Sequence, residues 1–338
     1  MNKTRLMGWD VLLDEYFFAK ALRPETEKSY RRVVAVFRQF IGHDTLPDEV
    51  THRDMLLWRR DMLGRGLTTS TWNNKVRHLC ALYNLGIKKK WLVLEENPLT
   101  GTQVPPGSKR KKILSRDQLV RINLILGQFE EREKHEAGKS RQCALFPVWY
   151  WRTVIDVLRS TGMRQNQLLH IRLRDVNLES HSILLCKEGS KTHREWLVPI
   201  VSFVRERMRI IVDRATAQGA EPDDYLFDVG RFLYPSGEAG AEPGIQPVRS
   251  FFTRLTKECG FKVSPHRFRH TLATEMMKSP DRNLAMVKGL LGHRSVSTTM
   301  EYVELDLKIT GQALEEELSL YMDVITAHEE ASRVLTQL

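Results

Sequence analysis

The chain has 338 residues, of which 41% are hydrophobic and 28% charged, and its formal net charge is +10. This composition is typical of a globular protein with two domains, and the longest apolar runs fall far short of the roughly 18 residues of a membrane span. No signal peptide is visible, and the four cysteines lack Cys-x-x-Cys spacing. We therefore expect no membrane partner, no zinc site, no disulfide framework and a reducing cytosol.

The positive charge is unevenly distributed along the chain. Residues 1–98 carry a net charge of +5, residues 99–114 add +4, and residues 309–338 are acidic at −5. Separate basic blocks indicate a polyanionic partner, with nucleic acid as the default. A solvated basic surface without a partner is the alternative interpretation.

Residues 1–98 have apolar side chains at helical spacing in four segments, the first over 8–22 and the last from about residue 69. Pro24 suits the start of the second helix, and Thr51 can cap the third. The next residues, 99–114, contain Pro105, Pro106 and a basic run. That composition does not form a packed element, so we expect an interdomain linker there.

A second domain is expected over 115–308, because Ser115 and Gln118 have the spacing of a capping box. An apolar helix over 146–159 is expected to end at Gly162. Arg164 would then begin a second helix that continues to about Leu173, and the N–H groups at a helix start favour an anion.

Two short strands, 182–186 and 195–199, flank a basic turn with Gly189 at its tip. An irregular stretch over 217–246 follows, in which Tyr225, Leu226 and Phe227 would form a short strand or a buried anchor. A helix over 247–259 comes next, and Pro265 starts another helix.

The end of the second domain combines several polar motifs. His266 and Arg269 lie one turn apart on the helix after Pro265. Further on, Leu290-Leu291-Gly292-His293 places a glycine where a helix would end. Ser297 or Thr298 can cap a short helix that carries Tyr302. The spacing of apolar residues over 309–333 predicts a last amphipathic helix.

Together these motifs resemble the tyrosine recombinase family of phage integrases and Xer-type enzymes. Its marks are Thr-Gly-x-Arg, a lysine on a β-hairpin, His-x-x-Arg, Leu-Gly-His and a tyrosine about nine residues on, and all appear here in order. The resemblance implies a mostly α fold with a small β-sheet. It comprises an N-terminal four-helix core-binding domain (1–98), a basic linker (99–114), a mixed α+β catalytic domain (115–308) and a C-terminal helix (309–338) that docks on a neighbouring subunit.

The resemblance also implies the site residues. The catalytic set would be Arg164, Lys191, His266, Arg269, His293 and Tyr302. Counting back from Pro199 favours Lys191 as the catalytic lysine, whereas counting forward from Arg164 favours Lys187. Where the family commonly has a glutamate three residues after the first arginine, this chain has Gln167, which we expect to hold Arg164 by a neutral hydrogen bond.

The implied function is site-specific DNA recombination through a 3′-phosphotyrosine intermediate, with no metal, ATP or other cofactor. The implied partners are double-stranded DNA with an inverted-repeat core site, three further copies in a tetramer on DNA, and in some systems accessory DNA-bending proteins. The free chain would be mostly monomeric, in the cytoplasm of a prokaryotic cell. The alternatives are a type IB topoisomerase and a DNA-binding regulator without activity.

Phosphate contacts in such a protein position the DNA without reading its sequence. The basic residues expected to make them lie in the first domain and the linker, and they are Arg31, Arg32, Lys75, Arg77, Lys88, Lys89, Lys90, Lys109, Arg110, Lys111 and Lys112.

Overall fold

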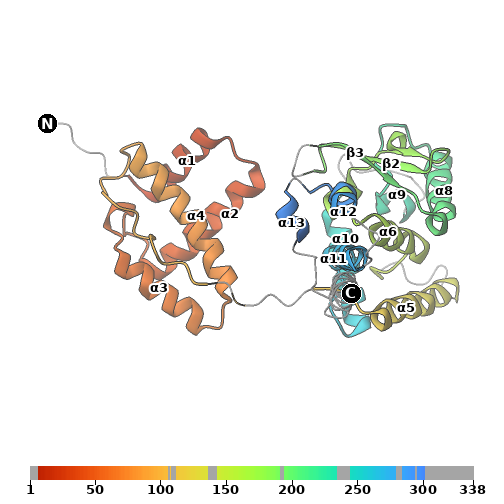
Figure 1. The fold of residues 1–338 in the computed structure, drawn as a ribbon, viewed down its shortest axis with the longest axis horizontal. Coiled ribbons are helices and arrows are strands. Elements are labelled where there is room, and N and C mark those ends of the chain that lie inside the picture. The colour runs from red at the N-terminus through yellow and green to blue at the C-terminus, as the bar shows by residue number, and fades with distance from the viewer. Residues whose placement is uncertain are drawn as a thin grey trace, which may run out of the picture. The chain divides into compact units, whose positions relative to one another are not determined.

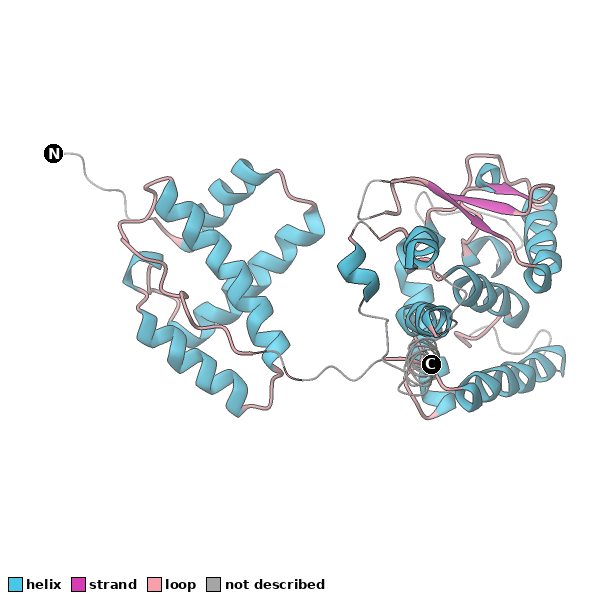
Figure 2. Ribbon diagram, viewed as in Figure 1, coloured by secondary structure: helices cyan, strands magenta, loops and turns pink. Residues whose placement is uncertain are grey.

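A computed structural model describes residues 7–105, 107, 112–135, 143–190, 194–233, 244–278, 284–293 and 295–300. The chain divides into two compact units, Met1–Arg110 and Lys111–Leu338. The described residues are mostly helical with one small sheet, as Figures 1 and 2 show, which confirms the expected fold class. None of the helices described is long and apolar enough to cross a membrane.

The first unit contains the expected helices α1 (Trp9–Lys20), α2 (Pro24–Ile41), α3 (His52–Gly64) and α4 (Thr69–Lys88). Pro24 is the first residue of α2, and the Thr51 side chain accepts a hydrogen bond from the Asp54 N–H at the start of α3. A 3-10 turn, Pro47–Glu49, precedes α3. Local capping chemistry therefore located these boundaries.

Large aromatic side chains fill the core of the first unit. Trp58 and Trp72 are almost fully buried and meet edge to face, with 5.2 Å between ring centroids. Phe37, Trp9 and Tyr83 continue the same cluster. These rings come from all four helices, so the helices share one core. Each buried ring removes a large apolar area from water and thereby stabilises the packing.

Both ends of the stretch 99–114, which was expected to be an unpacked linker, are packed. Leu99 is buried in the core of the first unit, and the Trp72 indole N–H donates to the Thr102 carbonyl at 2.9 Å. At the other end, Leu114 is buried in the second unit, and its N–H donates to Thr271 Oγ1 at 2.8 Å. The prolines and basic residues of this stretch predicted that it would not pack. Two single leucines, Leu99 and Leu114, nevertheless anchor its ends.

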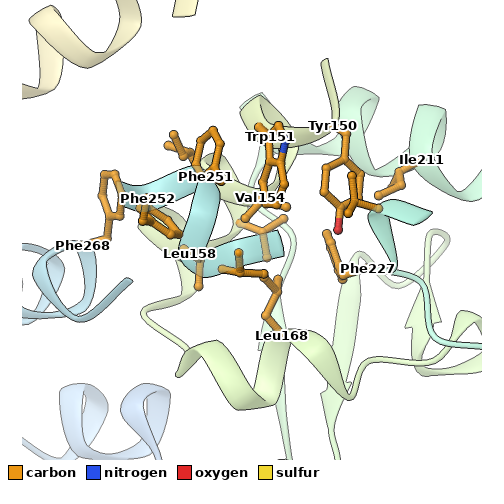
Figure 3. Close-up of a cluster of buried hydrophobic side chains, with 14 of the residues drawn as sticks. Tyr150, Trp151, Val154, Leu158, Leu168, Ile211, Phe227, Phe251, Phe252 and Phe268 are labelled. Atoms are coloured by element: carbon orange, nitrogen blue, oxygen red, sulfur yellow. The ribbon is translucent and has the colours of Figure 1, made fainter. Parts of the chain in front are cut away.

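The second unit is built around α6 (Val148–Thr161), which contacts α5 (Arg116–His135), α8 (Ser202–Ala217) and α11 (Pro265–Met277). Figure 3 shows the side chains that gather around Trp151 of α6. Its ring stacks on Phe251 of α10 (Ile245–Cys259), with 4.2 Å between centroids and 7° between planes. A helix buried on most sides gives the site a rigid base.

A three-stranded antiparallel sheet occupies one side of the described second unit, in the order β1 (Val176–Asn177), β2 (Ser182–Leu185) and β3 (Trp196–Pro199). The two predicted strands are confirmed, whereas β1 was not predicted. Ile183 of β2 is paired with Val198 of β3, and both side chains are buried. This alternation directs one face of the hairpin into the core.

The helix expected to continue from Arg164 to Leu173 is wrong in length, since α7 covers only Gln165–Leu169. Beyond it, the Leu226 N–H donates to the Ile171 carbonyl at 2.9 Å, and Arg172 forms a β-bridge with Tyr225. These pairings keep the chain extended until a 3-10 turn at Leu173–Asp175. Leu226 and Phe227 are buried, so this segment is the expected anchor. The short helix α9 (Val229–Leu233) follows it.

The last described helices are α12 (Leu284–Leu291) and α13 (Val296–Met300). The proposed cap at Ser297 or Thr298 is wrong, because α13 already begins at Val296 and the Ser295 hydroxyl accepts from the Ser297 N–H at 3.2 Å. Ser295, two residues before Ser297, therefore takes the capping role. Tyr302, Lys191 and the expected C-terminal helix lie outside the described residues.

Candidate functional site

The site begins where α6 ends. Gly162 caps α6 with φ +62°, a conformation that favours glycine, and a Cβ there would lie 2.7 Å from Leu291 Cδ2. Arg164 follows as the N-cap of α7, and its N–H donates to Gln167 Oε1 at 2.9 Å. Gln167 therefore holds Arg164 by a neutral hydrogen bond, as expected, and the bond is to the backbone.

Helix α11 supplies two more expected residues. The Ser264 hydroxyl caps it and Pro265 occupies the first turn, so the helix starts where the sequence indicates. His266 is exposed, whereas Arg269 is only 4% exposed. A buried guanidinium needs several acceptors to offset its desolvation. Arg269 Nη1 donates to the Gly162 carbonyl at 2.7 Å, and Nη2 donates to the Leu291 carbonyl at 2.9 Å.

The same guanidinium reaches His293. Gly292, with φ +62°, ends α12, and the His293 N–H donates to the Lys288 carbonyl at 3.1 Å. The ring is then held at both nitrogens, with Nε2 2.6 Å from Arg269 Nη2 and Nδ1 2.9 Å from Thr299 Oγ1. Thr299, in α13, is fully buried and was not singled out from the sequence, although it belongs to the run of serines and threonines that follows His293.

These contacts define the protonation state of His293. An arginine nitrogen can only donate, so Nε2 accepts, and the neutral ring carries its proton on Nδ1, which donates to Thr299. Burial and the charges of Arg269 and Arg164 lower the pKa of His293 from 6.5 to about 4. In this arrangement the His293 ring accepts a hydrogen bond from the Arg269 guanidinium.

Acidification should destabilise the fold through His293. Its pKa is about 4 in the folded protein against about 6.5 for an ordinary histidine in the unfolded chain, so the unfolded chain binds the proton first. Stability should be fully present above about pH 6.5 and should fall by about 3 kcal/mol as the pH drops to about 4. Thermal unfolding across this range measures the loss. The His293→Gln variant should lose less than the wild type, and equal losses would contradict this protonation state.

The structure thus brings three of the predicted catalytic residues together. Arg269 contacts His293 directly, and Arg164 is close enough to influence the pKa of that histidine. His266 lies one turn before Arg269 on α11. Lys187 is exposed at the start of the hairpin turn, while Lys191 and Tyr302 are outside the described part of the chain. The assembled groups form a cationic site with a neutral imidazole at its base.

A groove of about 520 Å³ adjoins this site. Gln165 and Pro265, the neighbours of Arg164 and His266 in the chain, are part of its lining, as are the exposed cations Arg249 and Lys262. The groove therefore continues the positive character of the site along α10 and the loop before α11. In the described residues, no group of three or more His, Cys, Asp or Glu side chains is placed to hold a metal ion.

The expected phosphate contacts differ in their surroundings. Arg31 donates to Asp14 Oδ1 at 2.7 Å and lies over the Phe17 ring, so it already has partners in its own unit. Burial, and then the charge of Arg32, lower the pKa of Lys75. An anion bound between Arg32 and Lys75 would relieve that repulsion.

The other basic candidates are exposed or not described. Arg77, Lys88, Lys89, Lys90 and Lys112 are exposed, whereas Lys109, Arg110 and Lys111 lie outside the described residues. All of these contacts stay predictions.

Comparison with known proteins gives concordant matches. A profile described as the phage integrase family matches residues 143–308. A putative tyrosine recombinase XerC of Pseudomonas syringae is 35% identical over 306 residues, which cover 90% of this chain and 63% of the relative. One from Pseudomonas aeruginosa is 34% identical over 298 residues, covering 87% and 68%. The chain thus spans slightly less than two thirds of the first relative and slightly more of the second.

Solved structures share the fold. The Tn1549 transposon integrase in complex with a circular intermediate DNA has a TM-score of 0.70 at 17% identity, covering 92% of this chain and 99% of that one. A lambda integrase tetramer bound to a Holliday junction has a TM-score of 0.64 at 16% identity, covering 89% and 78%.

Proposed function

This chain belongs to the phage integrase family of tyrosine recombinases, and from that premise we propose that it cuts and rejoins double-stranded DNA at a specific site through a 3′-phosphotyrosine intermediate. The observation that carries the proposal is the buried Arg269, fixed by two backbone carbonyls and His293 beside the helix start at Arg164. Such preorganised cations suit a reaction in which negative charge grows on a phosphate.

The proposed role of the two arginines is electrostatic. A phosphodiester resists attack because it is anionic and its alkoxide leaves poorly. Arg164 and Arg269 would donate to the non-bridging oxygens and stabilise the charge that builds there. Because Arg269 is held in place before DNA binds, little reorganisation is needed at the transition state. His293 would keep that guanidinium oriented, in addition to any contact it makes with phosphate.

In the proposed covalent step, one phosphoester bond forms while another breaks. The Tyr302 hydroxyl oxygen attacks phosphorus, and its proton passes to His266. The bond from phosphorus to the 5′ oxygen breaks, and Lys191 protonates that oxygen. The products are a 3′-phosphotyrosine and a 5′-hydroxyl end. Since one phosphoester bond replaces another, the energy of the bond is kept. The 5′-hydroxyl of another strand can therefore reverse the step and rejoin the DNA in a new combination.

The proposal is tested by trapping the covalent intermediate. Random-sequence duplexes that the Tyr302→Phe variant enriches would first reveal the preferred site. In a nicked duplex of that sequence, cleavage releases the short fragment that carries the 5′-hydroxyl. Without that hydroxyl the step cannot reverse, so the wild-type protein should stay on the DNA as a denaturant-stable adduct. On intact DNA that carries the site, a recombinase is expected to give products with exchanged partners. Relaxation without exchange would indicate a topoisomerase, and binding without any adduct would indicate a regulator.

The catalytic lysine can be identified by its leaving group. We expect Lys191→Ala to cleave ordinary DNA about 10²–10⁴-fold more slowly, because it lacks the general acid. A 5′-bridging phosphorothiolate should restore the rate, since a thiolate leaves without a proton. Gel assays of both substrates measure this, with Lys187→Ala as the matched control. Selective rescue of Lys187→Ala instead would transfer the role to Lys187.

The proposed partners follow from exchange between two duplexes. Two cut sites on each of two duplexes require four copies of the chain, and an inverted-repeat site presents equivalent halves to each pair. The lambda integrase structure noted above is such a tetramer on a Holliday junction. The free chain is expected to be mostly monomeric, because its basic surfaces repel until phosphates neutralise them. Residues 309–338 remain the proposed contact with the next subunit.

A further inference from the structure

The hairpin of β2 and β3 is attached to the site at two separate points. Its loop covers the residues between Leu185 and Trp196, the last pair of the strand register. Leu185 and Val198 are buried, so Trp196 lies on the inward face of the hairpin, two residues before Val198. Lys187 and Lys191, the candidates for the catalytic lysine, both belong to this loop.

The first attachment joins Trp196 to the segment before His293. The indole N–H donates to the Leu290 carbonyl at 3.2 Å. The ring lies directly against Gly292, so closely that an added Cβ at Gly292 would overlap it. The end of α12, from which His293 emerges, is therefore packed against the first residue of β3.

The second attachment joins the hairpin turn to α7. A Cβ at Gly189 would lie 2.9 Å from Gln167 Cα and 3.0 Å from the Asn166 carbonyl oxygen, so the two backbones are in direct contact. Asn166 Nδ2 also donates to the Gly189 carbonyl at 3.2 Å. Because α7 begins directly after Arg164, this contact ties the turn to the first arginine of the site. Ser190, the residue before Lys191, is fully buried.

We infer that Trp196 and Asn166 are positioning residues for the catalytic lysine. Trp196 holds the loop of that lysine close to His293, and Asn166 holds it close to Arg164. The inference rests on the proposed function. A loop fixed at Gly189 and at Trp196 has only six residues between those points. A general acid is effective only when it reaches the leaving oxygen, and a misplacement of about 1 Å can cost on the order of 10²-fold in rate.

A purely structural role for Trp196 makes a different prediction. If the substitution only loosened the core or displaced the segment that carries His293, cleavage would be slower whatever the leaving group. Loss of lysine positioning would slow only substrates whose leaving oxygen needs a proton. The contrast between an ordinary and a 5′-bridging phosphorothiolate duplex therefore separates the two roles.

The experiment compares Trp196→Ala, Asn166→Ala and the control Leu197→Ala in the full chain. Leu197 is the next residue on β3 and is 64% exposed. Adduct formation is measured on both nicked duplexes of the selected site. We expect Trp196→Ala to be about 10²-fold slower on ordinary DNA and Asn166→Ala about 10-fold slower. Both should approach the wild-type rate on the phosphorothiolate, and Leu197→Ala should match the wild type on both.

The inference is overturned if Trp196→Ala is equally slow on the two duplexes, or equally fast. Asn166 is exposed and its substitution removes one hydrogen bond, so this variant tests the inference even if Trp196→Ala fails to fold. A wild-type protein that forms no adduct on either duplex would instead refute the proposed function. Melting temperature and duplex binding are recorded for each variant.

Discussion

Tyr302→Phe should bind its duplex as tightly as the wild type and form no covalent adduct. The substitution removes only the hydroxyl oxygen that attacks phosphorus, and it keeps the ring. Loss of an enzyme nucleophile can lower the rate on the order of 10⁶-fold, and the remaining site cannot supply a substitute that leaves a protein–DNA bond. Denaturing gels of nicked duplexes measure the adduct, and native gels measure binding.

The control for this variant is a tyrosine elsewhere in the second unit. Tyr225 lies in the segment paired with Arg172, far along the chain from the motifs of the site. Tyr225→Phe should therefore form the adduct at the wild-type rate. If Tyr302→Phe still trapped DNA on a denaturing gel, Tyr302 would not be the nucleophile.

Arg269→Ala should lose both activity and stability. The variant leaves the Gly162 and Leu291 carbonyls without their donor, and a buried acceptor without a partner costs about 1–3 kcal/mol. We therefore expect a loss of about 2–4 kcal/mol in the free energy of unfolding. Cleavage should fall about 10²–10³-fold in protein that remains folded, as when one preorganised donor is removed from a developing anion. Chemical denaturation and adduct assays below the unfolding transition measure the two effects.

Arg267→Ala is the matched control for Arg269→Ala. Arg267 is on the same helix, and its Nη1 donates to the Ile113 carbonyl at 3.4 Å, a longer bond than either of the carbonyl bonds of Arg269. Its removal should cost no more than about 1 kcal/mol. An Arg269→Ala protein as stable as Arg267→Ala would contradict the view that Arg269 holds the end of α6 to the end of α12.

Features that depend on a few neighbouring residues were predicted well. Thr51, Ser115 and Gly162 mark helix ends because capping hydrogen bonds and a left-handed residue act within about one turn. The position of Arg164 before a helix follows from the same local rules. The motif set that identifies the family is also local in each of its parts, so the membership could be predicted before the fold was known.

The errors came from contacts between distant segments. The helix after Arg164 ends early because Ile171 and Arg172 pair with Leu226 and Tyr225, more than fifty residues away. The ends of the linker are packed because each places one leucine in a core whose other members are far along the chain. Composition averaged over sixteen residues does not report such single anchors.

The sequence by itself determined the helix ends capped by Thr51, Ser115 and Gly162, the strands of the hairpin, the residue types of the site and, through their order, the family. Only the tertiary structure decided how those side chains are used. Arg269 binds the carbonyl of Gly162, 107 residues away, and shares its guanidinium with His293. Trp196 reaches the carbonyl of Leu290, 94 residues on. The physical reason is that hydrogen-bond direction and ring burial depend on how α6, α11 and α12 pack, and side-chain periodicity specifies which face is buried but not which partner meets it.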